Sequence, residues 1–413
     1  MLFYIIFSCF YLIFSYKSDN FYCIININRY KFCEGEKITN REIYLDTLLF
    51  KNPKKILFEP GLPRKSTIER WRSDGLPQGI NWWDYIVRDK LNLDIVASKP
   101  IPDLGVDFRM IPWFEEKIIE HRGGCYIIQD WMGAILEISD KYDCTYIRNA
   151  IDFVTRRWIK CPVESPEDWA EMKKRYDSDN PKRVKIFAPG EISQINNRDS
   201  FLGVSVNGPF WQLREWLGFE NLCAAFLEEP EFITEMIEFW QDYVLRVFAR
   251  IFSQGINLDG VFISEDMAYK AHSMISPAMT REFLLPVYKK WINYFKSHGV
   301  KIIDMDSDGY IAELIPIWIE AEINVCDPIE VAAHNDINLY RETYKNKMAY
   351  RGGIDKRLIA AGGKAIEDEL KRISPVIESG GFIPSCDHGV PNDISLGNFI
   401  YYCELLAKHT GWL

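Results

Sequence analysis

The feature that most constrains the fold is an alternation of short apolar runs and amphipathic stretches, which is regular from about residue 200 onward. The runs recur at roughly 25–45-residue spacing, as expected for repeated strand–helix units. Residues 231–251 carry apolar side chains at the 3–4 spacing of one buried helix face. We therefore predict a parallel sheet with helices between its strands. The expected strands lie at residues 55–61, 201–209, 259–264, 300–303, 323–326, 348–351 and 382–385.

The predicted fold class is α/β, a (β/α)8 TIM barrel with an irregular N-terminal excursion. A barrel fits better than an open doubly wound sheet, because no strand is followed by a Gly-rich dinucleotide or phosphate-binding fingerprint. Polar residues also recur where the strands end, and in a barrel these ends form one rim that carries the active site. The strand-end residues are Glu59, Asn207, Glu265, Asp266, Asp304, Asp306, Asp327, Asp355 and His388.

The N-terminal segment, residues 1–37, is predicted to be an extension outside the fold. Its aromatic apolar run, residues 2–16, is shorter than the ~20 residues that span a bilayer. No basic residue precedes this run, as a signal peptide would require. A signal anchor is the alternative interpretation, which recovery of the protein in a membrane fraction would support.

The body of the protein is predicted to be one domain, residues 38–413. It begins with a helix at about residues 40–50, because Thr39 and Glu42 have the spacing of a capping box. A cap or insertion is expected within residues 81–190, where clean periodicity is missing and short strand-like runs occur.

The composition limits the classes of molecule that the protein is expected to bind. The net charge is −10 and there is no block of Lys or Arg, which argues against nucleic acid and an anionic membrane surface. A small-molecule substrate is expected instead, and a homodimer is one candidate assembly. The ten cysteines are scattered without a CxxC pair, so we predict a reducing, cytoplasmic location.

The sharpest candidate constellation on the rim is Asp304, Asp306 and His388. Side chains at positions i and i+2 of a strand point the same way, and two carboxylates with an imidazole can bind a divalent ion. Cys386, two residues before His388, could supply a thiolate. In a metal-free version, Asp304 or Asp306 is ionised beside His388 and raises the imidazole pKa so that it can donate a proton.

Glu265 and Asp266 form a second candidate, an acid pair in which one member holds a proton. The structural alternative is a helix N-terminus that is rich in acidic residues. In the same way, Asp308 is expected to cap a following helix.

Several segments carry a recognisable family pattern. They are Phe201 to Phe210, Glu265-Asp266-Met267 with Ser276-Pro277, Asp308-Gly309 with Leu314-Ile315-Pro316, Gly352 to Arg357, and Gly381 to Pro391. Together they resemble the uroporphyrinogen decarboxylase superfamily, whose members are TIM barrels. The resemblance covers residues 195–408 well and 39–80 loosely, and no motif places 81–190.

Compared with the true decarboxylases of this superfamily, the sequence departs at most of the characteristic positions. Their Arg-rich first turn is reduced to Arg64, and no Tyr occurs from 205 to 218; only His388 matches. An acidic rim also has the wrong sign for a substrate with eight carboxylates. A decarboxylase that uses His388 and Arg64 is therefore the second hypothesis.

The superfamily's corrinoid-linked methyltransferases bind zinc through a His-x-Cys and a later Cys. The resemblance places Asp304-Met305-Asp306 and His388 at those positions, with Cys386 nearby. It implies Zn2+, a corrinoid on a partner protein as methyl donor or acceptor, and an oxygen rather than a thiol on the substrate. We predict this branch, with Glu265 and Asp266 assisting His388; a non-catalytic barrel that binds a tetrapyrrole or corrinoid protein is the third hypothesis.

Overall fold

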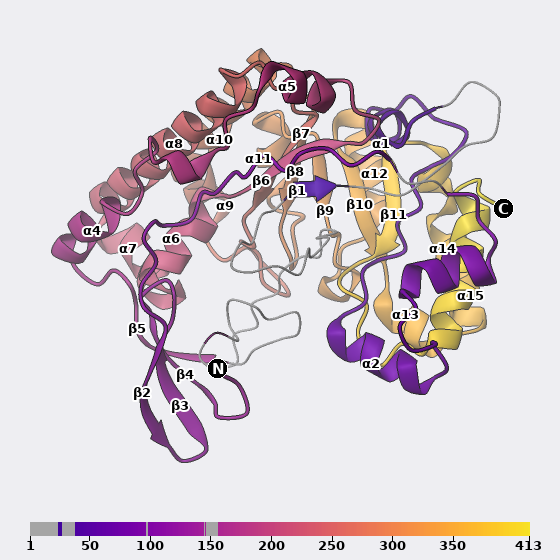
Figure 1. The fold of residues 1–413 in the computed structure, drawn as a ribbon, viewed down its shortest axis with the longest axis horizontal. Helices are drawn as coiled ribbons and strands as arrows, with labels where there is room; N and C mark the ends of the chain where they lie inside the picture. The colour runs from indigo at the N-terminus through magenta and orange to yellow at the C-terminus, as the bar shows by residue number, and fades with distance from the viewer. Residues whose placement is uncertain (1–23, 27–37, 96–97, 144, 146–155) are drawn as a thin grey trace.

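The computed structural model describes residues 24–26, 38–95, 98–143, 145 and 156–413 and has a seven-stranded sheet at its centre (Figure 1). The strand order is β1-β6-β7-β8-β9-β10-β11, in which β6 to β11 are parallel and β1 is antiparallel to β6. This confirms a mixed α/β protein with a parallel sheet. The strands are β1 (Ile24–Asn26), β6 (Leu202–Asn207), β7 (Gly260–Ser264), β8 (Ile302–Asp306), β9 (Val325–Asp327), β10 (Ala349–Ile354) and β11 (Phe382–Cys386).

Helices pack against this sheet. In Figure 1, α8 and α10 lie toward one end of the sheet and α13, α14 and α15 toward the other. The predicted amphipathic helix is confirmed as α8, whose face from Ile233 to Ile251 is buried. The α-helices are α1 (Asn40–Leu48), α2 (Lys65–Ser73), α4 (Pro166–Lys173), α5 (Pro189–Asn196), α6 (Pro209–Leu217), α7 (Phe219–Glu228), α8 (Pro230–Phe252), α9 (Pro277–Met279), α10 (Leu285–Ser297), α11 (Ile315–Glu320), α12 (Ile337–Tyr344), α13 (Lys356–Ala361), α14 (Lys364–Glu378) and α15 (Leu396–His409).

The predicted first helix and its capping box are confirmed. Thr39 and Glu42 form a reciprocal capping box at α1, in which the Thr39 side chain accepts from the Glu42 N–H and the Glu42 carboxylate accepts from the Thr39 N–H. Of the expected extension, only Ile24–Asn26 lies within the described residues. No helix in the described part of the chain is long and apolar enough to cross a membrane.

Three strand predictions need correction. Residues 55–61 do not form a strand; the segment that follows makes only an isolated parallel bridge between Pro63 and Val390. Strand β10 continues past residue 351 to Ile354. Strand β8 runs further than predicted, to Asp306, and Asp304 inside it accepts a hydrogen bond from Arg351. Both carboxylates therefore lie within a buried strand and not beyond its end.

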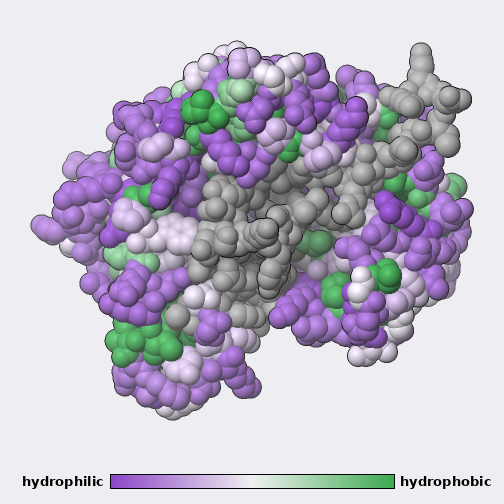
Figure 2. Space-filling view, viewed as in Figure 1, coloured by the Kyte–Doolittle hydropathy of each residue, from purple (hydrophilic) through white to green (hydrophobic). Residues whose placement is uncertain are grey.

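Residues 81–190 contain a separate antiparallel sheet in the order β2-β3-β4-β5. It projects from the body at the lower left of Figure 1, and Figure 2 shows hydrophobic side chains on that surface. Its edge strands expose Ile118, Ile119 and Ile159. The strands are β2 (Lys117–Arg122), β3 (Cys125–Gln129), β4 (Ile135–Ser139) and β5 (Arg156–Lys160).

A buried carboxylate holds the amino ends of the first two parallel strands. Asp259 accepts from Arg198 Nη2 at 2.5 Å, from the Leu202 N–H at 2.9 Å and from Arg41 Nε at 2.9 Å. Arg198 is fully buried, so its charge depends on this partner. Asp259 thereby connects α1 with the starts of β6 and β7.

We expect Asp259→Ala to lower the free energy of unfolding by about 3–5 kcal/mol, because the substitution leaves a buried guanidinium unpaired. Urea unfolding followed by circular dichroism measures this change. Glu320→Ala is the matched control: Glu320 pairs with Arg281 and Lys289 on the surface, where ion pairs contribute about 0–1 kcal/mol. Equal losses in the two variants would contradict the structural role of Asp259.

Candidate functional site

The centre of the candidate site is Arg351, a cation on the buried strand β10 that contacts three carboxylates. Its Nη2 donates to Glu59 at 2.9 Å and its Nη1 to Asp304 at 3.0 Å. Asp327 Oδ2, at the end of β9, lies 3.5 Å from the same Nη1. A buried guanidinium needs such partners because leaving water is costly. One positive charge is thus shared among three acids.

This imbalance opposes ionisation of the acids. Burial raises the pKa of Asp304, and the charge of Arg351 only partly opposes that rise. Burial and the neighbouring Asp304 raise the pKa of Asp327 well above its usual range. Two carboxylates that share a dry site cannot both ionise readily.

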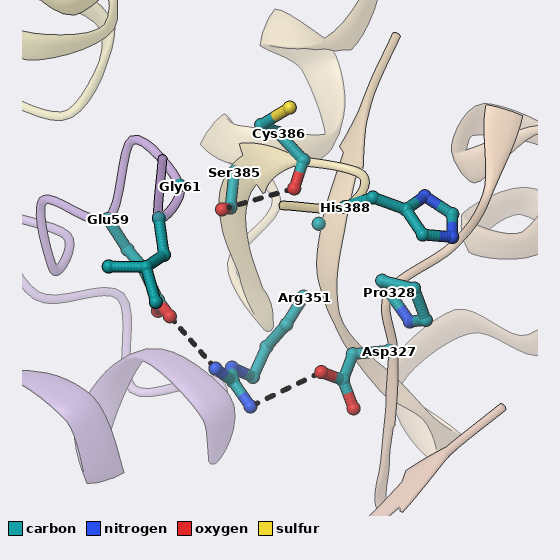
Figure 3. A pocket seen from close by; sticks show the side chains of 10 residues that line it. Glu59, Gly61, Asp327, Pro328, Arg351, Ser385, Cys386 and His388 are labelled. Carbon is teal, nitrogen blue, oxygen red and sulfur yellow. Dashed lines mark hydrogen bonds and ion pairs between the residues drawn. The ribbon is translucent and has the colours of Figure 1, made fainter. Parts of the chain in front are cut away.

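A small pocket opens beside Arg351 at the carboxyl ends of the strands (Figure 3). Its cavity of about 30 Å³ has room for one or two water molecules. Figure 3 shows Glu59 and Asp327 approaching Arg351 from two sides, with the His388 ring beside Pro328. The lining residues are Glu59, Gly61, Leu62, Asp327, Pro328, Arg351, Gly352, Ser385, Cys386 and His388.

His388 follows β11, and its side chain is only 1% exposed. Its Nε2 lies 3.0 Å from Asp308 and 4.0 Å from Glu330, while its Nδ1 lies 2.9 Å from Lys356 Nζ and 3.6 Å from Asp387. Burial alone would lower the pKa of His388, but Asp308 and Asp387 outweigh it and raise the pKa to about 10. The carboxylates that raise this pKa are Asp308 and Asp387, and not Asp304 or Asp306 as predicted.

Asp266 links the Asp308 region to a cation on α6. Its Oδ1 accepts from the Asp308 N–H at 3.1 Å, and its carbonyl accepts from Arg214 Nη1 at 3.0 Å. Burial, then the negative charges of Asp308 and Asp306, raise the pKa of Asp266 well above its usual range. The predicted protonated acid in the Glu265–Asp266 pair is in keeping with this environment.

Glu265 occupies a structural position. It is fully buried, and its Oε2 accepts from the Trp211 N–H at 2.9 Å in the first turn of α6, while Oε1 accepts from the Tyr288 hydroxyl. Gly208 permits this approach, since a Cβ there would lie 2.1 Å from the Glu265 carboxyl carbon. Burial raises the pKa of Glu265 to about 7, even though both hydrogen bonds favour the charged form.

The predicted metal ligands are not brought together as a set. Asp304 is bonded to Arg351, and both nitrogens of His388 face other side chains. Figure 3 shows the sulfur of Cys386 pointing away from Arg351 and Asp327. Within the described ranges, no three His, Cys, Asp or Glu side chains are arranged to hold a metal ion. This donor set does not fit zinc.

Arg64 and Asp308 were also predicted to have roles, and the structure shows where both lie. Arg64 is the N-cap residue of α2 and its N–H donates to Val390 O at 3.2 Å; it is not among the pocket-lining residues. Asp308 does not cap a helix, because α11 begins seven residues later at Ile315, and the carboxylate pairs with His388 instead.

Sequence reasoning missed Arg351 and Lys356. An arginine inside a buried strand is itself a signal, because such a charge requires carboxylate partners. Lys356 gave no comparable signal, since a lysine in the first turn of a helix is ordinarily solvated. Its contact with His388 depends on β10 and β11 being neighbours.

Comparisons with known proteins agree with this architecture. A family model described as uroporphyrinogen decarboxylase (URO-D) matches residues 156–409. A methyltransferase from Methanosarcina mazei superposes with a TM-score of 0.51 at 12% identity, over 90% of this chain and 98% of that one. A B12-independent methionine synthase from Shewanella sp. W3-18-1 gives a TM-score of 0.34 at 12% identity, over 55% and 67%. No curated protein matches.

The pKa of Glu265 has a consequence for stability. The folded protein holds this proton up to about pH 7, whereas an unfolded glutamate with the usual pKa of 4.5 has released it. The unfolding free energy therefore falls as the pH rises from about 4.5 through 7, by an order of 3 kcal/mol from this group alone. We expect Glu265→Gln to remove this slope.

The measurement is urea unfolding of both proteins at several pH values between about 5 and 8. The stability of Glu265→Gln should rise relative to that of the unsubstituted protein as the pH increases. Glu320→Gln serves as the control, because Glu320 is exposed and paired on the surface. Parallel pH curves for the unsubstituted protein and Glu265→Gln would show that Glu265 carries no raised pKa.

Proposed function

This chain belongs to the uroporphyrinogen decarboxylase family, and from that premise we propose that it transfers a methyl group to or from an oxygen or nitrogen of a small substrate. The observation that carries the proposal is the excess of acids around Arg351, which Glu59, Asp304 and Asp327 already share. The two cationic side chains that line the pocket, Arg351 and His388, already face carboxylates of the protein and are not available to an anionic substrate. A neutral or cationic substrate suits such a site better than one with eight carboxylates.

The proposed fold is a (β/α)8 barrel. Six parallel strands follow one another in chain order, and the Pro63–Val390 bridge puts the segment after residue 55 beside β11, where a barrel would have its first strand. The strand-end acids then share one rim, as in barrel enzymes. The likeness to the Methanosarcina mazei protein extends over 90% of the chain and supports the same arrangement.

His388 is the proposed proton donor. When a methyl group leaves an oxygen or nitrogen, the C–O or C–N bond breaks, the methyl goes to the acceptor, and the heteroatom takes up a proton. His388 lines the pocket and, with its raised pKa, holds a proton at neutral pH. Methylation in the reverse direction returns that proton. Asp308 holds the imidazole in place at 3.0 Å.

A corrinoid on a partner protein is the proposed methyl donor or acceptor; it supplies a reactive cobalt–carbon bond. In this proposal the corrinoid is a reactant that the partner protein brings and not a resident cofactor. Zinc has no part in the proposal, because the rim residues do not fit it.

The test uses free methylcobalamin as the methyl-donor probe with a panel of small alcohols and amines, followed by the absorbance change on demethylation. We expect turnover that His388→Gln lowers by roughly 100-fold or more, which is the usual contribution of a general acid or base. His409→Gln is the control, since His409 is exposed at the end of α15. Carbon dioxide release from uroporphyrinogen, or no consumption of methylcobalamin with any acceptor, would contradict methyl transfer.

A further inference from the structure

We infer that Lys356 is a positioning residue for His388, sharing one proton with its Nδ1 and leaving Nε2, which lies 3.0 Å from Asp308, to carry a hydrogen. The inference rests on the proposed function only for the use made of that proton. Its basis is the 2.9 Å separation between Lys356 Nζ and His388 Nδ1.

The chemistry of the two nitrogens fixes what this contact can be. An ammonium group only donates, so a protonated Lys356 requires Nδ1 to be an acceptor. If the imidazole carries the Nδ1 proton instead, Lys356 must be the neutral acceptor. In both forms one proton lies between Nζ and Nδ1, and the other ring nitrogen, Nε2, carries a hydrogen. The pair therefore has one positive charge and not two.

The neighbours from every packed segment favour this arrangement. Asp308 follows β8, Glu330 follows β9 and Asp387 follows β11; they lie 3.0, 4.0 and 3.6 Å from the nearest imidazole nitrogen. Lys356 Nζ also lies 3.6 Å from Asp387 and 3.9 Å from Glu330. These carboxylates raise the pKa of His388 to about 10. The imidazole therefore competes with the Lys356 amine for the one proton between Nζ and Nδ1.

The arrangement also gives a route for the proton. The His388 side chain is 1% exposed, whereas that of Lys356 is 21% exposed. When Nε2 gives its proton to a substrate, the bridging proton can move fully onto Nδ1, and Lys356 recovers a proton from water. Lys356 thus connects a buried imidazole with solvent.

The test is nitrogen NMR of the full chain labelled with 15N-histidine, with His388→Gln assigning one signal among the six histidines. We expect the Nδ1 shift of His388 to lie between the protonated and acceptor limits at pH 7. Lys356→Met should move it to the protonated limit, because Asp308, Asp387 and Glu330 then hold a full imidazolium. Lys356→Arg should move it toward the acceptor limit, because a guanidinium keeps its proton.

The control is Lys364→Met, which removes an exposed lysine paired with Asp368 and should leave the signal unchanged. A fully protonated Nδ1 in the unsubstituted protein that does not move in Lys356→Met would overturn the inference. A misfolded Lys356→Met protein leaves the comparison with Lys356→Arg, where an unchanged shift would also overturn it. Because the NMR needs no substrate, its outcome is independent of whether methyl transfer occurs.

Discussion

The interaction on which the site depends is the binding of Arg351 by acids from three separate segments. A guanidinium on a buried strand loses its hydration, and only nearby carboxylates can offset that cost. Glu59 comes from the segment before α2, Asp304 from β8 and Asp327 from β9. The ion cluster therefore connects residues 55–63, which form no strand, to the strands beside them. The pocket lies directly beside this cluster.

A second consequence is that the rim is divided into two polar groups with different chemistry. Around Arg351, the carboxylates outnumber the cation, and burial raises the pKa of Asp304 and of Asp327. Around His388, the acids Asp308, Glu330 and Asp387 face one imidazole and one lysine, and the imidazole holds its proton tightly. The excess of acids thus has two effects. It attracts a neutral or cationic substrate, and it keeps a proton available on His388. Both are suited to transfer of a methyl group at a heteroatom.

Much of this arrangement could be predicted from the sequence, because it depends on local patterns. The alternation of apolar runs gave the parallel strands, and the Thr39–Glu42 spacing gave the start of α1. The polar strand ends singled out His388, Asp304 and Asp327, but the structure divides them between two groups, one around Arg351 and one around His388. The predictions that failed concern residues whose partners lie in distant segments of the chain. Asp308 has the local pattern of a helix cap, yet its partner is 80 positions away.

Contacts between distant segments also explain the other predictions that failed. Residues 55–61 are apolar enough for a strand, but only the bridge at Pro63 pairs with the neighbouring chain. Arg351 stood in the predicted strand at 348–351, and its partners could not be chosen without the strand order. Metal ligation by Asp304 was plausible until Arg351 was found beside it. Pairing between strands therefore decided the chemistry of residues whose positions were already predicted.

The most direct test of the account is a double-mutant cycle between Arg351 and Asp304. Arg351→Met, Asp304→Asn and the double variant are each unfolded in urea at neutral pH. If Arg351 is the common partner of the buried acids, the double variant will be more stable than the sum of the single losses predicts, with a coupling energy of about 1–3 kcal/mol. Strictly additive losses would contradict it.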